Sequence, residues 1–327
     1  MASVPATVDR ARRSGLGREF IARLRRGDAV AHLITLLAAA SIIVVTVMLV
    51  YQLYLNSALS RHKFGFSFFL GKTWDPVSGE FGALPFIYGT VVSSALALLV
   101  AVPLGVGAAI FLSELAPARI SNALTFVIEL LAAVPSVIYG LLGIFILVPV
   151  LRTTVMPFLK TTLGFLPLFK GPIYGVSMLA GGLVLAIMIV PFIISVSREV
   201  LMAVPVEQRE AALGLGATKW ESTWQVVVPF ARVGIMASIF LALARALGET
   251  MAVTMVIGND PRISASLFAP GYSIAAVIAN EFTEATGDLY LQALIELGLV
   301  LFLLTILING LARLVIIATT QKGAAQA

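Results

Sequence analysis

Long stretches without a charged side chain recur along the chain and set its predicted architecture. Four of them contain no Asp, Glu, Lys or Arg: 29–60, 81–113, 130–151 and 171–197. Two further apolar stretches, near 233–258 and 289–319, carry a few charges inside them. Each is longer than the roughly 20 residues that a helix needs to cross a bilayer. The pattern predicts an all-α integral membrane protein with six transmembrane helices, at 29–54, 85–112, 123–150, 174–197, 233–257 and 290–318.

One more charge-free segment, 263–280, interrupts this simple map. It contains three Ser residues and a central Pro270-Gly271 pair, and it is only moderately apolar. A seventh span there would move the C-terminus to the opposite side of the membrane. We expect instead a re-entrant or surface-lying segment on the outer face, because irregular backbone is tolerated only where protein or water satisfies it.

The composition excludes a soluble enzyme. Hydrophobic residues make up 59% of the chain and charged residues only 12%, with a mean hydropathy of +1.01. A soluble domain has roughly twice that charged share. The chain has no Cys and only two His, so thiolate and His-based metal sites are not expected. The surroundings are membrane lipid, and the net charge of +5 is not a signal for nucleic acid.

The distribution of basic residues predicts the orientation in the membrane. Of the 22 Lys and Arg residues, 14 fall on the side of the N-terminus, 7 on the other side and one within a span. Because basic loops stay on the cytoplasmic side, both termini are expected in the cytoplasm. The first apolar run is longer than the core of a cleaved signal peptide, so it is expected to remain as a span.

The segment 198–230, between the fourth and fifth spans, predicts a cytoplasmic helix–turn–helix. Good helix formers fill 206–213, and Gly216 permits a tight turn after them. Thr218 and Glu221 form the T-x-x-E pattern of a capping box, which opens a second helix. Pro229 is expected to end that second helix just before the fifth span.

This hairpin has the side chains of a docking surface. Leu213, Leu215, Trp220 and Trp224 supply apolar anchors, and charged residues such as Arg209 can pair with a partner. An amphipathic hairpin whose Trp rings lie among lipid headgroups explains the composition equally well. The residues alone leave both interpretations open.

The fifth predicted span contains two charges, Arg245 and Glu249. As i and i+4 residues of one helix they would share a face, roughly 20 Å from the cytoplasmic end. A charge this deep in a bilayer should face protein or a watery path. A self-neutralising pair that locks two helices together is one explanation. The other is an anion path, since the Arg fork suits an oxyanion and Thr250 adds a hydroxyl.

The hairpin sequence resembles the EAA loop of ABC importer permeases. Glu210-Ala211-Ala212, three residues, Gly216, nine residues and then 226–229 (Val-Val-Val-Pro) follow that family's spacing, with Val in place of both family aliphatics. In the family this loop is a coupling helix that sits in a cleft of the ATPase. The resemblance therefore implies ATPase-coupling roles for Glu210, Ala211, Ala212, Gly216 and, as an anchor, Trp220.

Two further strings are similar to PstC-type permeases of phosphate importers. They are RALGETMAVTMVIGN at 245–259 and AVPSVIYG at 133–140, and the similarity extends over roughly 80–318. The resemblance implies a type I ABC importer permease fold. It also implies that Pro135 and Tyr139 shape a helix break, although plain helix packing explains these two residues at least as well. The substrate path implied by the resemblance contains Arg245, Glu249, Thr250, Ser136 and Tyr139.

The same resemblance implies partners and a location. A PstA-like second permease subunit, a PstB-like ATPase dimer and a PstS-like phosphate-binding protein would complete an importer in a bacterial or archaeal plasma membrane. No cofactor is expected in this chain, and ATP and Mg²⁺ would bind the ATPase. The nearest P-loop candidate, at 65–73, has five residues between its glycines instead of four.

The predicted organisation has four parts and leaves other functions open. The parts are an Arg-rich cytoplasmic tail (1–28), the first span (29–54), a permease core (80–318) that includes the coupling loop, and a C-terminal tail (319–327). A sulfate or molybdate permease would share these features. An ATP-independent carrier using Glu249 as a proton site, or a structural membrane anchor, would differ in needing no ATPase.

Overall fold

The computed structural model describes residues 28–324, with side chains from 30 to 314. The chain divides into two compact units between Leu55 and Asn56. Of the first unit the structure describes helix α2 (Asp28–Asn56), which matches the span predicted at 29–54. The Arg-rich tail predicted at 1–28 lies outside the described residues, apart from Asp28.

The prediction of six spans is confirmed in the described part of the chain. Six helical stretches there are long and apolar enough to cross a membrane: Val30–Asn56, Leu84–Leu115, Ser136–Leu163, Met178–Met202, Lys219–Leu247 and Asp288–Leu314. The chain is therefore a multi-pass integral membrane protein. The last helix, α16 (Asp288–Ala324), continues past the predicted end at 318.

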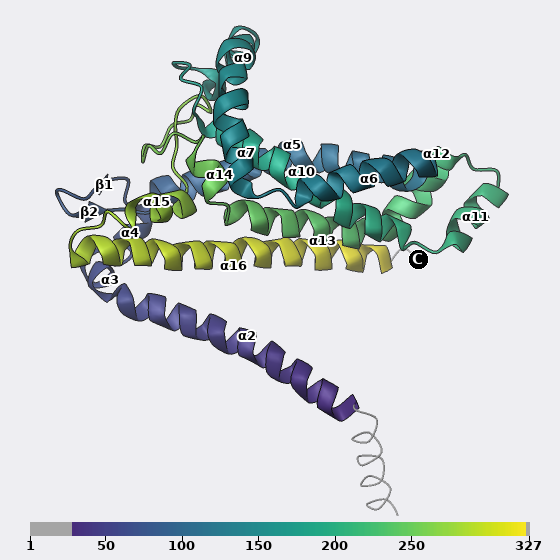
Figure 1. Cartoon of the computed structure of the whole chain (residues 1–327), viewed down its shortest axis with the longest axis horizontal. Helices are drawn as coiled ribbons and strands as arrows, with labels where there is room; N and C mark the ends of the chain where they lie inside the picture. Colours follow the sequence, from purple (N-terminus) through teal and green to yellow (C-terminus); the bar gives the residue numbers. More distant parts are fainter. Residues whose placement is uncertain (1–27, 325–327) are drawn as a thin grey trace, which may run out of the picture. The chain divides into compact units, whose positions relative to one another are not determined.

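Helix α10 (Met178–Met202) forms the centre of the second unit, packed between α5 (Leu84–Ile110) and α13 (Val228–Leu247). Figure 1 shows these helices side by side with α16. Glycines allow the close approach: a Cβ on Gly105 would lie 2.7 Å from Ile193, and one on Gly182 would lie 2.5 Å from Leu96. Small residues at helix contacts are the usual means of tight packing between membrane helices.

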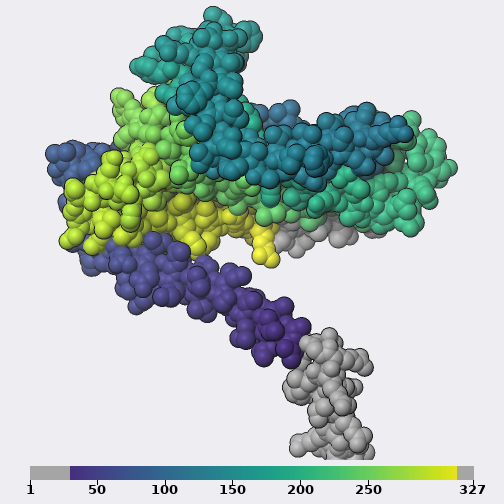
Figure 2. All heavy atoms as spheres, in the orientation of Figure 1, coloured from purple at the N-terminus to yellow at the C-terminus, as the bar shows by residue number. Residues whose placement is uncertain are grey.

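The third span does not lie where the sequence placed it, at 123–150. Helix α6 (Ala118–Ala132) ends before Pro135, and a new helical run begins at Ser136. Proline disfavours helical backbone in the residue before it and cannot donate to the preceding turn, so the chain breaks here. The new run stands out steeply from the neighbouring helices (Figures 1 and 2). It consists of α7 (Ser136–Leu142), π-helical η2 (Gly143–Leu147), α8 (Val148–Val150), π-helical η3 (Leu151–Val155) and α9 (Met156–Leu163).

The fifth span differs from its prediction at both ends. It begins at Lys219, because α12 (Lys219–Ser222) continues through a π-helical turn, η5 (Thr223–Val227), into α13. Pro229 does not end the hairpin's second helix, as was predicted. It lies at the start of α13, directly after the π-helical turn, and such a turn helps a membrane helix to tolerate the missing N–H of a proline. The span ends at Leu247 rather than at 257, and a short helix, α14 (Met251–Thr254), follows.

The prediction that the segment 263–280 is not a span is confirmed. The segment is a loop followed by the eight-residue helix α15 (Ile274–Glu281). Its first residues, such as Ile263, are exposed, but Phe268 and residues 274–277 are buried, and the Ile274 N–H donates to Thr90 Oγ1 at 2.9 Å. The second half of the segment is therefore packed into the helix bundle against α5.

The two ends of the second unit carry different structures (Figure 1). One end has α3 (Ala58–Phe64), α4 (Ser67–Leu70) and a two-stranded hairpin, β1 (Trp74–Asp75) with β2 (Glu80–Phe81). The other end has the π-helical η1 (Phe111–Leu115) and helices α11 (Val206–Gly214) and α12. A single 3-10 turn, η4 (Pro167–Phe169), follows α9. The end that carries the β1–β2 hairpin is called the hairpin end, and the opposite end is called the α11 end.

Candidate functional site

Two interrupted helices meet in the middle of the second unit. The helical run that starts at Ser136 packs against α14, directly after the fifth span has ended. Gly140 is at the contact: a Cβ there would lie 2.7 Å from Met255 Sδ and 3.1 Å from the Ala252 Cα. The structure therefore brings together the two strings that resembled the permease family, 133–140 and 245–259.

Tyr139 bridges the break between α6 and α7. Its ring is 7% exposed, and its hydroxyl donates to the Leu131 carbonyl at 2.7 Å across the break. The charge of Arg245 acts on the Tyr139 hydroxyl, which places the two predicted path residues near each other. Ser136, the first residue of α7, is half-buried and lies one helical turn before Tyr139 in sequence.

Arg245 lies in the last turn of α13 and is exposed. Its guanidinium carbon is 5.9 Å from the centroid of the Phe192 ring, at cation–π distance. Among the described residues no hydrogen bond or ion pair connects it to another side chain. A guanidinium with five N–H donors in an apolar span is therefore accessible to an anion.

The i, i+4 spacing predicted that Glu249 and Arg245 share one helix face, and this prediction is wrong. Helix α13 ends at Leu247, and Gly248 turns the chain out of the helix. Glu249 instead accepts a hydrogen bond from the Ala252 N–H at 3.2 Å, which caps the first turn of α14. Thr250 donates from its hydroxyl to the Gly248 carbonyl at 3.3 Å.

Sequence reasoning missed Phe192 as a neighbour of Arg245. It lies in the apolar core of α10, in a run of Val, Pro, Phe and Ile that carries no polar signal. Only the packing of α10 against the end of α13 selects this ring from the 19 Phe residues of the chain.

The helix–turn–helix predicted at 198–230 has the expected turn and the expected capping box. Gly216 takes a φ of 92°, which only glycine adopts without strain, and a Cβ there would meet nothing within 4 Å. The capping box of Thr218 and Glu221 is formed in both directions. The Thr218 N–H donates to Glu221 Oε2 at 2.8 Å, and the Glu221 N–H donates to Thr218 Oγ1 at 3.3 Å.

The residues predicted to couple the chain to an ATPase lie in two places. Glu210 and Ala211 are exposed on α11, Ala212 is half-buried, and the tip residue Leu215 is 90% exposed. Trp220 packs edge to face on Trp224 at 5.5 Å. Both Trp rings line an apolar groove against α5 instead of continuing the α11 surface.

Arg209 has its partner within the chain. It forms a two-pronged ion pair with Glu114, through Nε to Oε2 at 3.1 Å and Nη2 to Oε1 at 2.9 Å. Its Nη2 also donates to the Leu201 carbonyl at 2.7 Å. The expectation that Arg209 pairs with a partner protein is therefore not met in this structure. The pair ties α11 to η1, the turn that ends the second span, a link that sequence reasoning missed.

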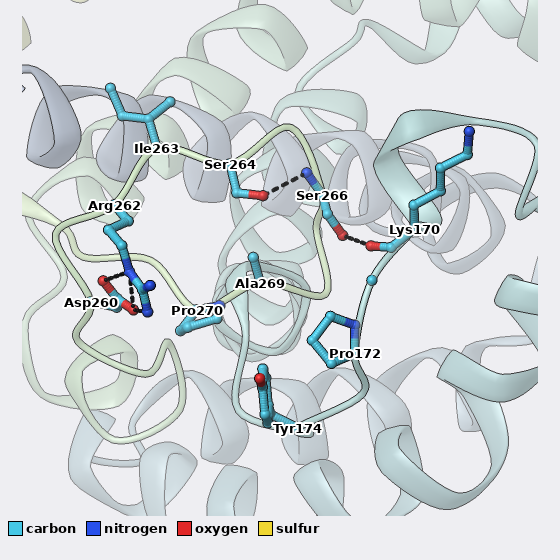
Figure 3. Close-up of a pocket in the computed structure, with 11 residues that line it drawn as sticks. Lys170, Pro172, Tyr174, Asp260, Arg262, Ile263, Ser264, Ser266, Ala269 and Pro270 are labelled. Carbon is cyan, nitrogen blue, oxygen red and sulfur yellow. Dashed lines mark hydrogen bonds and ion pairs between the residues drawn. The ribbon is translucent and has the colours of Figure 1, made fainter.

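A polar pocket opens between the loops at 170–174 and 260–270. It has a volume of about 340 Å³, and Lys170, Tyr174 and Arg262 lie on its walls (Figure 3). Arg262 forms an ion pair with Asp260, with Nε 2.8 Å from Oδ1, and this bond raises the pKa of the guanidinium. The loop at 260–270 continues the segment that carries Glu249 and Thr250, so the pocket adjoins the site in sequence.

Comparison with known proteins places these features in a family. Residues 101–316 match the family of binding-protein-dependent transport system inner membrane components. No group of three or more His, Asp or Glu able to hold a metal ion occurs among the residues with described side chains.

Curated relatives extend the similarity over most of the chain. It is 50% identical over 297 residues to the phosphate transport system permease protein PstC of Mesorhizobium japonicum, covering 90% of this chain and 91% of that one. It is 44% identical to PstC of Xylella fastidiosa strain 9a5c, covering 91% and 93%. It is 46% identical to PstC of Haemophilus influenzae, covering 88% and 92%.

Among solved structures, the chain is similar to a bacterial ABC transporter involved in the import of the acidic polysaccharide alginate. The TM-score is 0.56 at 16% identity, over 90% of this chain and 98% of that one. At this identity the similarity shows the fold alone. The fold is that of a type I ABC importer permease, as predicted.

Proposed function

The chain belongs to the family of inner membrane components of binding-protein-dependent transport systems, and we propose that it carries inorganic phosphate through a membrane as a permease subunit. Relatives that share 44–50% of its residues are named phosphate transport system permeases. As in those relatives, its role is transport and not catalysis. The observation that carries the proposal is the exposed guanidinium of Arg245 at the meeting point of two broken helices.

In this proposal Arg245 is the phosphate-binding residue of the path. Its planar fork donates two parallel hydrogen bonds to an oxyanion, and Phe192 holds the guanidinium from one side. Tyr139 shapes the break beside it, and Ser136 and Thr250 add hydroxyl groups. Each of these groups offers hydrogen bonds that an anion can exchange as it moves.

Glu249 gives the site a preference for a protonated oxyanion. Its carboxylate is held by the α14 cap and not by Arg245, so it remains an acceptor for a proton-bearing phosphate oxygen. Sulfate is fully ionised near neutral pH and has no such proton to donate. Phosphate is therefore the substrate we favour over sulfate and molybdate.

Energy would come from a separate ATPase that docks on α11. In this proposal a PstB-like dimer binds ATP and Mg²⁺ and contacts Glu210, Ala211 and Ala212, which lie on α11. The Arg209–Glu114 ion pair would pass the movement of α11 to the end of the second span. A PstA-like subunit would form the other half of the path, and a PstS-like protein would deliver phosphate at the hairpin end.

Phosphate uptake by an Arg245→Gln variant tests the central residue. We expect uptake to be abolished while the complex still assembles and hydrolyses ATP, because only the binding fork is lost. Arg232→Gln is the matched control, an exposed arginine on the same helix. Uptake that survives Arg245→Gln, or that falls equally with Arg232→Gln, would overturn the assignment.

Reconstitution tests the dependence on partners. Liposomes that contain this chain alone are expected to take up no phosphate, and uptake should appear only with the second permease, the ATPase and ATP. Transport by the chain alone, driven by a pH gradient, would instead identify a secondary carrier.

A further inference from the structure

A buried carboxylate with one unsatisfied oxygen lies near the hairpin end of α16. Glu296 is 2% exposed, and its Oε2 accepts no hydrogen bond within the described structure. The Ser60 hydroxyl of α3 is fully buried and is the side-chain hydroxyl that acts on the Glu296 carboxyl. An unsatisfied buried carboxylate oxygen is costly, so Glu296 Oε2 points to a missing ligand.

The Glu296 side chain adjoins a small pocket between α3, α4 and α16. Its volume is about 260 Å³, and its lining residues are Arg61, Gly65, Phe66, Phe69, Glu296, Leu299 and Val300. Arg61 donates from Nε to Ser57 Oγ at 3.1 Å and interacts electrostatically with Glu296. The pocket thus holds opposite charges on otherwise apolar walls.

An exposed apolar stripe continues from this pocket along α16. Leu303, Leu307 and Leu314 follow Glu296 at intervals of seven, four and seven residues, which keeps them on one face of the helix. Their side chains are exposed. In a membrane-spanning helix, such a stripe is suited to contact with an acyl chain.

We propose that the pocket binds the headgroup of phosphatidylethanolamine, with an acyl chain along α16. The primary ammonium of this lipid donates N–H bonds to the Glu296 carboxylate, which as an ion can only accept. Its phosphate, two carbons away, lies toward the Arg61 guanidinium. The rings of Phe66 and Phe69 surround the ethanolamine. Phosphatidylcholine offers no N–H, and phosphatidylglycerol offers no positive charge, so neither meets the needs of Glu296.

Lipid binding to the purified full-length chain tests this site. Native mass spectrometry would compare lipids of identical acyl chains whose headgroup nitrogen carries zero, one, two or three methyl groups. We expect affinity to fall along the series, with phosphatidylethanolamine binding about tenfold more tightly than phosphatidylcholine, as expected for loss of a charge-assisted hydrogen bond. This comparison needs no variant, so it does not depend on how a mutant folds.

Two variants assign the effect to the pocket. Glu296→Gln should reduce the preference for phosphatidylethanolamine over phosphatidylcholine to within about twofold, since the amide keeps the shape but not the charge. Glu284→Gln, an exposed acid at the same end, should leave the preference unchanged. Equal affinities across the methylation series, or a full preference in Glu296→Gln, would overturn the proposal.

Discussion

At the scale of single residues, Glu249 and Arg245 have separate structural tasks. Arg245 is placed by α13 and by the ring of Phe192, whereas Glu249 holds the start of α14. Neither needs the other to keep its position. A charge that is not neutralised by a permanent internal partner can release and rebind an anion, which is what a transport path requires.

Two substitutions at Glu249 separate capping from charge. Glu249→Gln keeps an oxygen that can accept from the Ala252 N–H, so the free energy of unfolding should change by less than about 0.5 kcal/mol. Glu249→Ala removes the cap and should lower the free energy of unfolding by about 1 kcal/mol. Both should reduce the selectivity for phosphate over sulfate in transport assays. Equal destabilisation by both variants would indicate that the charge itself is structural, through Arg245.

The sequence predicted which residues matter here better than how they are arranged. A lone Arg and Glu in an apolar run are conspicuous whatever the local backbone. Their pairing depended on an unbroken helix, and Gly248 ended it. Phe192 could not be found at all, because its neighbours in sequence are as apolar as it is.

At the scale of elements, the contact between α7 and α14 depends on Gly140. Gly140→Val should force α7 away from the Ala252 backbone and cost about 1–3 kcal/mol of stability. The same shift would separate Tyr139 from Arg245, so phosphate uptake should fall at least about tenfold.

Gly107→Val is the matched control for this substitution. Gly107 is also helical, but a Cβ there would meet nothing within 4 Å. Thermal unfolding and uptake of the control should stay close to the wild-type values. If both variants behaved alike, the α7–α14 contact would not be important for transport.

The Arg209–Glu114 pair is expected to transmit force between α11 and the second span. Arg209→Gln should cost about 1–3 kcal/mol, between the values for exposed and buried pairs. Fewer phosphate ions should be transported per ATP hydrolysed, because the ATPase would move α11 without moving η1. Assays of phosphate uptake and of ATP hydrolysis in the same proteoliposomes measure this ratio.

A double-mutant cycle with Glu114→Gln shows whether the effect belongs to the pair. The double variant should be no worse than either single variant, since the link is already broken. Lys219→Gln, an exposed residue of the same hairpin, should keep the wild-type ratio. Additive losses in the double variant would argue for two independent roles.

The prolines show why element boundaries were only partly predictable. Pro135 and Pro229 look alike in sequence, each within an apolar run, but the first ends a helix and the second lies in the first turn of one. At Pro229 a π-helical turn precedes the proline and absorbs it. The choice between these outcomes depends on packing against α5 and α10, which a local pattern does not contain.

At the scale of the whole molecule, the orientation in the membrane connects these sites to a direction of transport. The basic residues predict that α11 faces the cytoplasm and the hairpin end faces outward. The chain has no Cys, so single cysteines can be introduced without a background. Ser78→Cys, in the exposed turn between β1 and β2, should react with an impermeant thiol reagent in intact cells. Leu215→Cys, 90% exposed beside α11, should react only after permeabilisation when the chain is expressed without its proposed ATPase. The reverse pattern would place α11 outside, where no ATPase could reach it, and the proposed coupling would fail.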